Sequence, residues 1–323
     1  EKQSKQNITK IADILPEILK EEIPLGENKI IISVSIGISS KRDQILSTAN
    51  LALKQAKKRM ESYILYDDSM NVSGKYQNNL KQLYQIQKII NGNGVIPYFQ
   101  PIIDNQSGKI EKFECLMRLV DKDEVLSPIQ FMELSKRAKM YNTLTKIMIE
   151  KSIDYFKNLN CDFSINLCIN DILNRETTKF LIDKITEHNI GKRIIIEFLE
   201  TDRIENNPEV LRFIRQLKEL NCRIAIDDFG SGYSNFDFIL RMDFDFLKID
   251  SALIKNIVSD KNAQIMIETI VVFTRKLQIK TIAEFVHNKE VYEKIISLGI
   301  DYSQGYYIGK PEPELLDSRS FFL

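Results

Sequence analysis

Short apolar runs in this chain repeatedly end in a polar side chain that could hold a metal ion or a phosphate. The side chains at these positions are Asn166, Glu197, Glu200, Asp227, Asp228, Lys248, Glu284 and Gln304. Carboxylates that meet at one place repel one another, so a cluster of them binds cations strongly. Oxygen ligands without Cys or His favour Mg²⁺ or Mn²⁺ over zinc. The residue types therefore predict a site for divalent cations.

The adjacent carboxylates Asp227 and Asp228 suggest a more specific chemistry. In a strand their side chains start on opposite faces, and the turn supplied by DFGSG could bring both to one side. A shared carboxylate can bridge two ions about 3.5–4 Å apart, which is the usual apparatus for cleaving phosphodiesters. Lys248 would then hold or activate the attacking water, and Gln304 would fix the substrate or a ligand. Asn166 lies in an apolar run, so its amide is expected to be buried and to need partners.

Each of these residues also has a purely structural interpretation. Asp227 and Asp228 before Phe-Gly are typical of a turn. Glu197 and Glu200 could be a solvated strand end and a helix cap, and Lys248 could form a surface ion pair of little energetic value. A functional site would be absent only if all of these structural interpretations were correct at once. Their joint occurrence at successive strand ends favours a functional site.

The elements that would position these residues form a regular series. From about Pro101 onward, apolar runs alternate with amphipathic stretches such as Pro208 to Leu220 and Lys261 to Leu277. This is the rhythm of a parallel sheet that is covered on both faces. A (β/α)₈ barrel delivers the C-terminal ends of all its strands to one rim, where active sites lie. The sequence thus predicts an α/β protein with a TIM-type barrel.

Length and composition limit the alternatives. The 323 residues exceed the roughly 250 of one barrel, so a second, smaller unit is expected. Lys plus Arg and Asp plus Glu both number 45, which argues against binding to duplex DNA or RNA or to an anionic membrane. No apolar run approaches the ~20 residues that span a bilayer. Without an initiator methionine or secretion signal, the chain is expected to be a segment of a longer protein.

The cysteines and histidines carry no recognisable site of their own. The four cysteines form no C-x-x-C pair, so they are expected to be reduced thiols in a reducing compartment, the cytoplasm. His188 and His287 are the only histidines, and neither lies in a context typical of a Ser-His-Asp hydrolase.

The first ninety residues have a different predicted order of strands and helices from the rest of the chain. A strand is predicted at Lys29–Ile38, a helix at Ile45–Met60, a second strand at Tyr63–Tyr66 and a connecting helix at Tyr76–Ile90. The glycine-rich turn at 91–94 ends that helix. The predicted organisation is a partial α/β unit at 1–72, a linker helix at 73–93 and the barrel at 94–323.

The motifs together resemble the EAL-domain family of cyclic di-GMP phosphodiesterases. The family's E-x-L-x-R motif matches ECLMR at Glu114–Arg118, after the opening pair Gln100 and Pro101. Further matches are Asn166, Glu197 to Glu200, DDFGSGYS at 227–234, KID at 248–250, AEFV at 283–286 and QGYYIGKP at 304–311. The resemblance covers residues 94 to 313. It implies a barrel with one antiparallel strand near its start and a homodimer formed through the EAL domain.

The resemblance also implies the reaction and the roles of residues. It implies hydrolysis of cyclic di-GMP to linear pGpG with two ions, Mg²⁺ or Mn²⁺. The first ion would be held by Glu114, Asn166, Glu197 and Asp227, and the second by Asp227, Asp228 and Glu284. Lys248 matches the lysine that positions the attacking water, and Lys248, Glu114 and Glu284 are expected to be essential for catalysis. Arg118, Gln304, Gln100 and Pro101 are expected at the substrate, and Glu200 is expected to steady the loop after DDFG.

Departures from the family pattern lie around the ligands. They are Cys115, Leu199 and His287, and the last two are expected to affect rate, regulation or support of the second metal ion. The N-terminal residues Ser33–Ser39 and Ala49–Asp68 resemble the second half of a GGDEF domain. Since the GTP-binding half is not in this chain, cyclase activity is not expected.

Two other functional classes remain open from the sequence. One is a module that binds cyclic di-GMP and signals without turnover, although such sensors usually lose metal ligands that this chain keeps. The other is a barrel lyase or isomerase that uses Lys248 with a metal-stabilised enolate.

Overall fold

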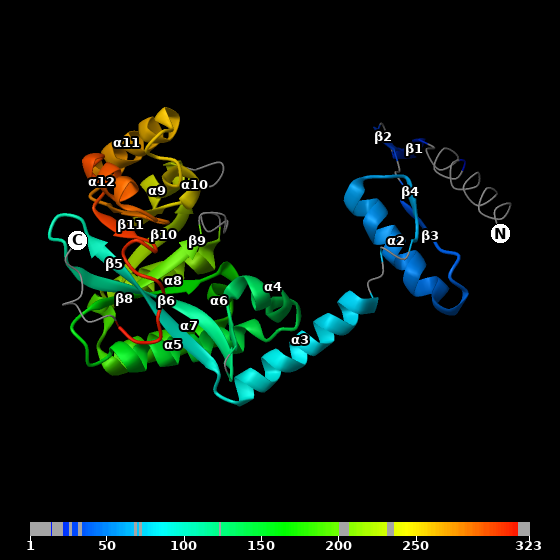
Figure 1. The fold of residues 1–323 in the computed structure, drawn as a ribbon, viewed down its shortest axis with the longest axis horizontal. Coiled ribbons are helices and arrows are strands. Elements are labelled where there is room, and N and C mark those ends of the chain that lie inside the picture. Colours follow the sequence, from blue (N-terminus) through cyan, green and yellow to red (C-terminus); the bar gives the residue numbers. More distant parts are fainter. Residues whose placement is uncertain are drawn as a thin grey trace. The chain divides into compact units, whose positions relative to one another are not determined.

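The computed structural model describes residues 14, 22–25, 28–31, 34–67, 70, 73–122, 124–199, 207–230 and 236–315. The chain divides into two compact units, Glu1–Gln82 and Leu83–Leu323 (Figure 1). None of the described helices is long and apolar enough to cross a membrane.

The described residues of the first unit before Ser73 form two small sheets and one long helix. Its elements are β1 (Glu22–Leu25), β2 (Asn28–Ile31), β3 (Ile36–Ile38), the 3₁₀ turn η1 (Arg42–Gln44), α2 (Ile45–Arg59) and β4 (Tyr63–Leu65). β1 pairs with β2 in antiparallel orientation, and β3 pairs with β4 in parallel orientation. The single strand predicted at Lys29–Ile38 is therefore wrong, because this stretch contains β2 and β3, which belong to different sheets. The helix and the following strand are confirmed.

Close contact between α2 and β3 explains the composition of this unit. Ala52 and Ala56 are fully buried against Ile64, so the inner face of the helix carries small side chains. A Cβ atom on Gly37 would lie 2.1 Å from the backbone oxygen of Ala49. Only glycine fits there, because the helix packs directly onto the strand backbone.

The connecting helix α3 (Ser73–Asn91) ends at the predicted glycine turn. Its last residues belong to the second unit, where Ile86 and Ile89 are buried in the main core. Lys88 forms an ion pair of 3.1 Å with Asp121. The end of α3 is thus fixed to the start of the barrel.

The second unit is a closed barrel of eight strands: β5 (Val95–Asp104), β6 (Ile110–Asp121), β8 (Asp162–Leu167), β9 (Ile194–Leu199), β10 (Arg223–Phe229), β11 (Phe246–Ile249), β12 (Lys280–Ala283) and β13 (Tyr302–Gln304). β5 is antiparallel to both of its neighbours, β6 and β13, and closes the barrel. The neighbouring pairs from β6 through β8 to β13 are parallel. The predicted barrel with one antiparallel strand is confirmed. The short β7 (Glu124–Leu126) extends the free end of β6 as a hairpin.

Helices cover the outside of the barrel (Figure 1). They are α4 (Pro128–Arg137), α5 (Tyr141–Phe156), α6 (Ile169–Leu173), α7 (Arg175–His188), α8 (Pro208–Glu219), α9 (Phe236–Arg241), α10 (Ser251–Ile254), α11 (Lys261–Lys276) and α12 (Lys289–Ser297), with the 3₁₀ turn η3 (Gly191–Arg193) before β9. Ser127 and Gln130 form a capping box at the start of α4, with Pro128 in the first turn. The apolar face predicted for α8 is buried at Val210, Ile214 and Leu217.

The barrel interior is layered. Ile102, Ile195, Ala225, Phe246 and Ile282 form a separate buried cluster inside the barrel, with Tyr302 packed against it. Because side chains alternate between the two faces of a strand, residues two positions further along also point inward. Those positions carry the candidate site.

Candidate metal centre

A layer of polar side chains lies next to the apolar layer inside the barrel, two residues further along the parallel strands. On the parallel strands Ile195 is followed two residues later by Glu197, Ala225 by Asp227 and Phe246 by Lys248. Further members reached in the same way are Glu284 after Ile282, Gln304 after Tyr302 and, on the reversed strand β5, Gln100 before Ile102. The strand period thus places six predicted residues at one end of the barrel.

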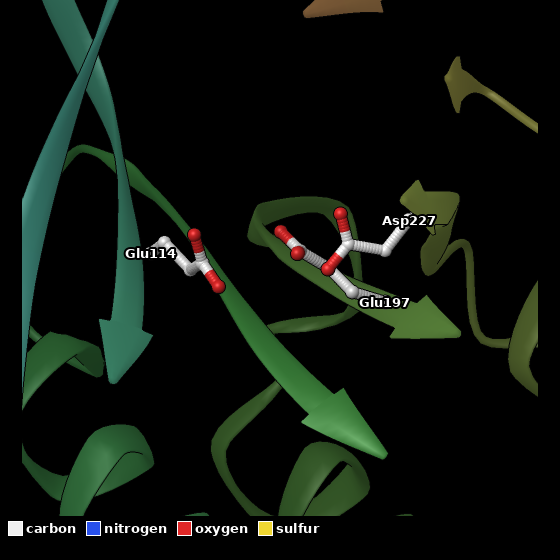
Figure 2. A group of neighbouring side chains, drawn as sticks. All are labelled: Glu114, Glu197 and Asp227. Atoms are coloured by element: carbon white, nitrogen blue, oxygen red, sulfur yellow. The ribbon is translucent and has the colours of Figure 1, made fainter. Parts of the chain in front are cut away.

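Two groups of carboxylates form within this layer. Ligand oxygens of Glu114, Glu197 and Asp227 lie within 4.8 Å of one another, and Figure 2 shows these three side chains converging. Oxygens of Asp227, Asp228 and Glu284 form a second group at the same spacing. Asp227 belongs to both. The structure therefore brings together the five carboxylates predicted as metal ligands, with Asp227 in the position of the bridging one.

Lys248 lies at the centre of these carboxylates and is fully buried. Its Nζ atom lies 2.7 Å from Glu197 and 2.9 Å from Glu284. The same atom lies 3.1 Å from Asp227 and 3.3 Å from Glu114. Burial by itself lowers the pKa of this lysine, but the four carboxylates outweigh burial and hold the pKa well above its usual value. The carboxyl groups around Lys248 therefore favour its protonated, cationic form.

The single positive charge of Lys248 does not neutralise all the carboxylates around it. Burial, together with the neighbouring carboxylates, raises the pKa of Glu197 to about 8 and the pKa of Asp228 to about 6. Burial also raises the pKa of Asp227, and it raises the pKa of Glu284 well above the usual range. Raised pKa values in a carboxylate cluster mean that further positive charge is favoured there. A divalent cation would supply it.

Glu114 differs from the other carboxylates. Burial raises its pKa, but the charge of Lys248 and hydrogen bonds from Gln304 and Asn166 outweigh burial, so the net pKa is lowered. The donors are Nε2 of Gln304 and Nδ2 of Asn166, each at 2.6 Å. Glu114 is thus held ionised at the rim. Asn166 is exposed rather than buried, which corrects the expectation for its amide; it reaches Glu114 from the rim of β8.

A β-bulge brings Asp227 and Asp228 to the same site. The register between β10 and β11 shifts between Ile226 and Phe229, and Asp228 has a left-handed backbone with φ of 58°. The bulge, inside β10, replaces the turn that the sequence suggested. Phe285, directly after Glu284, is also left-handed with φ of 59°. Non-glycine residues in this region are uncommon, and two of those in this chain, Asp228 and Phe285, lie at or next to the carboxylates.

Gln304 and Gln100 form a fixed pair beside Glu114. Nε2 of Gln304 donates to Oε1 of Gln100 at 3.1 Å, and Nε2 of Gln100 donates to the backbone oxygen of Gly309 at 3.2 Å. Oε1 of Gln304 is buried without a hydrogen-bond partner in the described part of the chain. An orphaned buried acceptor of this kind is suited to a bound ligand.

The other predicted substrate residues, Arg118 and Pro101, line neither of the two pockets beside the carboxylates. Arg118 is half-buried, places its guanidinium 5.5 Å from the centre of the Tyr98 ring and donates to the backbone oxygen of Met117 at 2.8 Å. Pro101 is buried and follows Gln100 in β5, so it starts on the opposite face of that strand. Glu200 lies outside the described residues.

Two pockets flank the carboxylates, and both include Glu114 and Leu116. The first, here called the β12 pocket, has about 480 Å³ and is lined among others by Asp228, Glu284, Phe285, His287, Gln304 and Tyr306. The second, called the α4 pocket, has about 370 Å³ and is lined among others by Lys136, Tyr141, Asn166, Cys168, Leu199 and Asp227. Both volumes fall within the range of small-molecule sites.

Several lining residues carry no signal in the sequence. Phe285 and Tyr306 are next or close in sequence to predicted site residues, but no motif or spacing in the sequence assigned a role to their aromatic rings. Lys136 and Tyr141 come from α4 and α5 and reach the site only through the packing of these helices.

Of the departures from the family pattern, Leu199 is the register partner of Asp227, and Nδ1 of His287 lies 3.1 Å from the backbone oxygen of Phe285. Cys115 is buried, burial raises the pKa of its thiol, and all four cysteines are free.

Comparison with known families decides the assignment of the barrel. The model of the EAL domain matches residues 84–311, which is more than half of the chain. The chain belongs to the EAL domain family. Among curated relatives, the EAL-containing chain is 29% identical over 298 residues to cyclic di-GMP phosphodiesterase PdeB of Shewanella oneidensis, covering 87% of this chain and 35% of that protein. It is also 29% identical over 317 residues to cyclic di-GMP phosphodiesterase PdeA of Borreliella burgdorferi, covering 91% of this chain and 46% of the relative. The chain thus spans less than half of either relative.

Solved structures show the same EAL fold. An EAL domain protein from Listeria monocytogenes is 29% identical, with a TM-score of 0.63 over 71% of this chain and 93% of that one. The Xanthomonas citri FimX EAL domain, described in complex with c-diGMP, has a TM-score of 0.69 over 76% of this chain and 99% of that one. At 19% identity the latter supports the fold alone.

Proposed function

We propose that the EAL domain of this chain hydrolyses cyclic di-GMP to linear pGpG with two divalent cations. The observation that carries this proposal is the position of Asp227 in two carboxylate groups at once. A two-metal phosphodiesterase needs such a shared ligand between ions about 3.5–4 Å apart. The names of the relatives from Shewanella oneidensis and Borreliella burgdorferi support the substrate.

The donor set fits Mg²⁺ or Mn²⁺. Glu114, Asn166, Glu197 and Asp227 would hold one ion, and Asp227, Asp228 and Glu284 would hold the other. All of these donors are oxygens, the type that both cations prefer. When bound, the ions would lower the pKa of the attacking water and neutralise the phosphate charge.

The protein side chains supply orientation and charge. Lys248 stays protonated, because its pKa is held well above the usual value, so it acts as a donor that fixes the attacking water rather than as a base. Glu114 belongs to the first carboxylate group and Glu284 to the second, and both line the β12 pocket. We propose that both are essential for turnover. The orphaned oxygen of Gln304, held in place by Gln100, would accept a hydrogen bond from the substrate.

The two pockets suit a ligand with two similar halves. A cyclic dinucleotide lying across Glu114 and Leu116 would place one half in the β12 pocket and the other in the α4 pocket. Arg118 would contact a phosphate, for which a planar guanidinium is well suited. Pro101, on the opposite face of β5, would support the strand that carries Gln100, and Glu200 would steady the loop after Asp228.

We also propose that the N-terminal unit is the C-terminal half of a GGDEF-like domain at 1–72, joined to the barrel by the helix at 73–93. The parallel pair β3 and β4 joined through α2 supports this assignment. So does the relative MucR of Pseudomonas aeruginosa, named a bifunctional diguanylate cyclase/cyclic di-GMP phosphodiesterase, which matches over 94% of this chain.

A homodimer through the EAL domain and a cytoplasmic location complete the proposal. Exposed apolar side chains on α9 and α11, among them Leu240, Ile265 and Val272, support a contact between two copies. The four free cysteines support a reducing compartment.

A hydrolysis assay tests the main proposal. The chain is incubated with cyclic di-GMP and Mg²⁺ or Mn²⁺, and the products are separated by chromatography. Linear pGpG that disappears when the metal is chelated is the expected result. Absence of linear product across several metals and pH values would contradict hydrolysis, and calorimetric binding without turnover would then favour the sensor alternative.

A further inference from the structure

One cation lies among the residues that line the α4 pocket, together with the carboxylates of Glu114 and Asp227. Lys136 is the only lysine or arginine among the described residues that line either the α4 pocket or the β12 pocket. It lies in the last turn of α4, on the helix that covers the pocket. Much of the remaining wall is apolar, with Met117, Met132 and Met148 among its residues, and Thr145 and Asn166 are polar members of it.

The side chain of Lys136 is exposed, and its ammonium lies over an aromatic ring that lines the same pocket. Its Nζ atom lies 5.0 Å from the centre of the Tyr141 ring, and Tyr141 is itself buried. The charge of Lys136 also acts on the thiol of Cys168, which lines the same pocket. Within the described part of the chain its ammonium makes no ion pair with a carboxylate. The ammonium thus lies beside an aromatic ring and keeps its hydrogen-bonding capacity for a ligand.

We infer that Lys136 reads the base in the α4 pocket and makes the site specific for guanine over adenine. This inference rests on the proposed function, because it takes a cyclic dinucleotide as the ligand. Guanine presents two acceptors, O6 and N7, to which lysine donates, whereas adenine presents a donor at N6 beside N7. The same ammonium therefore stabilises a bound guanine and disfavours the amino group of an adenine. Lys136 is a specificity-determining residue, remote from the reacting phosphate.

Three substitutions in the full chain test this role against cyclic di-GMP and cyclic di-AMP. Lys136→Met keeps the length of the side chain and removes the charge, Lys136→Arg keeps a donor for O6 and N7, and Lys139→Met is the control at an exposed lysine just beyond α4. We expect Lys136→Met to lower kcat/KM for cyclic di-GMP by about 10- to 100-fold, as for loss of a base-reading contact. The variant should leave kcat/KM for cyclic di-AMP unchanged or higher. Lys136→Arg should retain most of the preference, and Lys139→Met should match the original chain.

The outcomes separate this inference from the proposed function. An equal loss for both dinucleotides, or no change in their ratio, would overturn the role of Lys136 while leaving hydrolysis intact. If the original chain binds cyclic di-GMP in calorimetry but does not cleave it, the same comparison is made with Kd values in the presence of Ca²⁺. A chain that neither cleaves nor binds cyclic di-GMP would overturn both.

Discussion

Lys248 donates to the carboxylate of Glu197 at 2.7 Å, and each side chain is only 1% exposed. A buried ion pair of this kind is a poor source of stability, since removing both charges from water costs as much as their attraction returns. Its presence at the C-terminal rim of a barrel is instead a functional feature. The ammonium offsets the repulsion between carboxylates that lie close together in a site suited to divalent cations.

Removal of that ammonium should affect stability and turnover differently. In Lys248→Met, several buried carboxyl groups lose their partner, and we expect the free energy of unfolding without metal to fall by about 3–5 kcal/mol. Urea unfolding in EDTA measures this change, and saturating Mn²⁺ should restore part of it. Hydrolysis should be abolished, while calorimetry still detects binding of cyclic di-GMP. The control Lys280→Met removes an exposed partner of Asp301 and should cost under about 1 kcal/mol. Unchanged turnover in Lys248→Met would contradict the role of Lys248 at the attacking water.

The number of metal ions bound per chain should depend on which of the two adjacent aspartates is changed. Asp228→Asn removes a charge from the second carboxylate group only, and asparagine tolerates the left-handed backbone at this position. Calorimetric titration with Mn²⁺ should therefore detect one ion in this variant and two in the original chain. Asp227→Asn disturbs both groups and should weaken both sites. Two intact sites in Asp227→Asn would show that Asp227 is not the bridging ligand.

Stability without metal should fall as pH rises. The pKa of Asp228 is raised to about 6 and that of Glu197 to about 8, so the folded chain holds protons that the unfolded chain has released. Stability is then largest below the unfolded values near 4 and declines as pH passes through about 6 and 8. Thermal unfolding in EDTA between about pH 5 and pH 8.5 measures this decline. Asp228→Asn should flatten its lower part.

The same experiment with metal should give the opposite slope. Metal ions replace protons on the carboxylates, so saturating Mn²⁺ should stabilise the chain more at high pH than at low pH. A decline in stability that is identical with and without Mn²⁺ would show that these carboxylates do not hold the ion.

The proposed dimer should depend on the exposed face of α11. Ile265 and Val272 are 60% and 54% exposed, so changing both to Asp should not disturb folding. Light scattering at micromolar concentration should then report a monomer for the double variant and a dimer for the original chain. Ile129→Asp on α4, at a side chain that is 95% exposed, is the control and should remain dimeric. If the double variant has the mass of the original chain, the contact lies elsewhere.

The sequence by itself determined the barrel and most of its polar layer. Each strand alternates between its two faces, so an inward apolar residue such as Ile195 fixes Glu197 as inward two positions later. The same counting applies to Ala225 and Asp227. The motifs then indicated the family, and the resemblance to that family implied the one antiparallel strand near the start of the barrel.

Only the tertiary structure decided how these residues meet. The bulge that turns Asp228 toward Asp227 depends on pairing between β10 and β11, which are separated in sequence by α9. The exposure of Asn166 at the rim depends on where β8 ends relative to its neighbours. Lys136 enters the α4 pocket because α4 packs across the strand ends, and no local pattern encodes a contact between distant elements. Periodicity is local and can be read from the chain, whereas register and packing arise from all the strands and helices together.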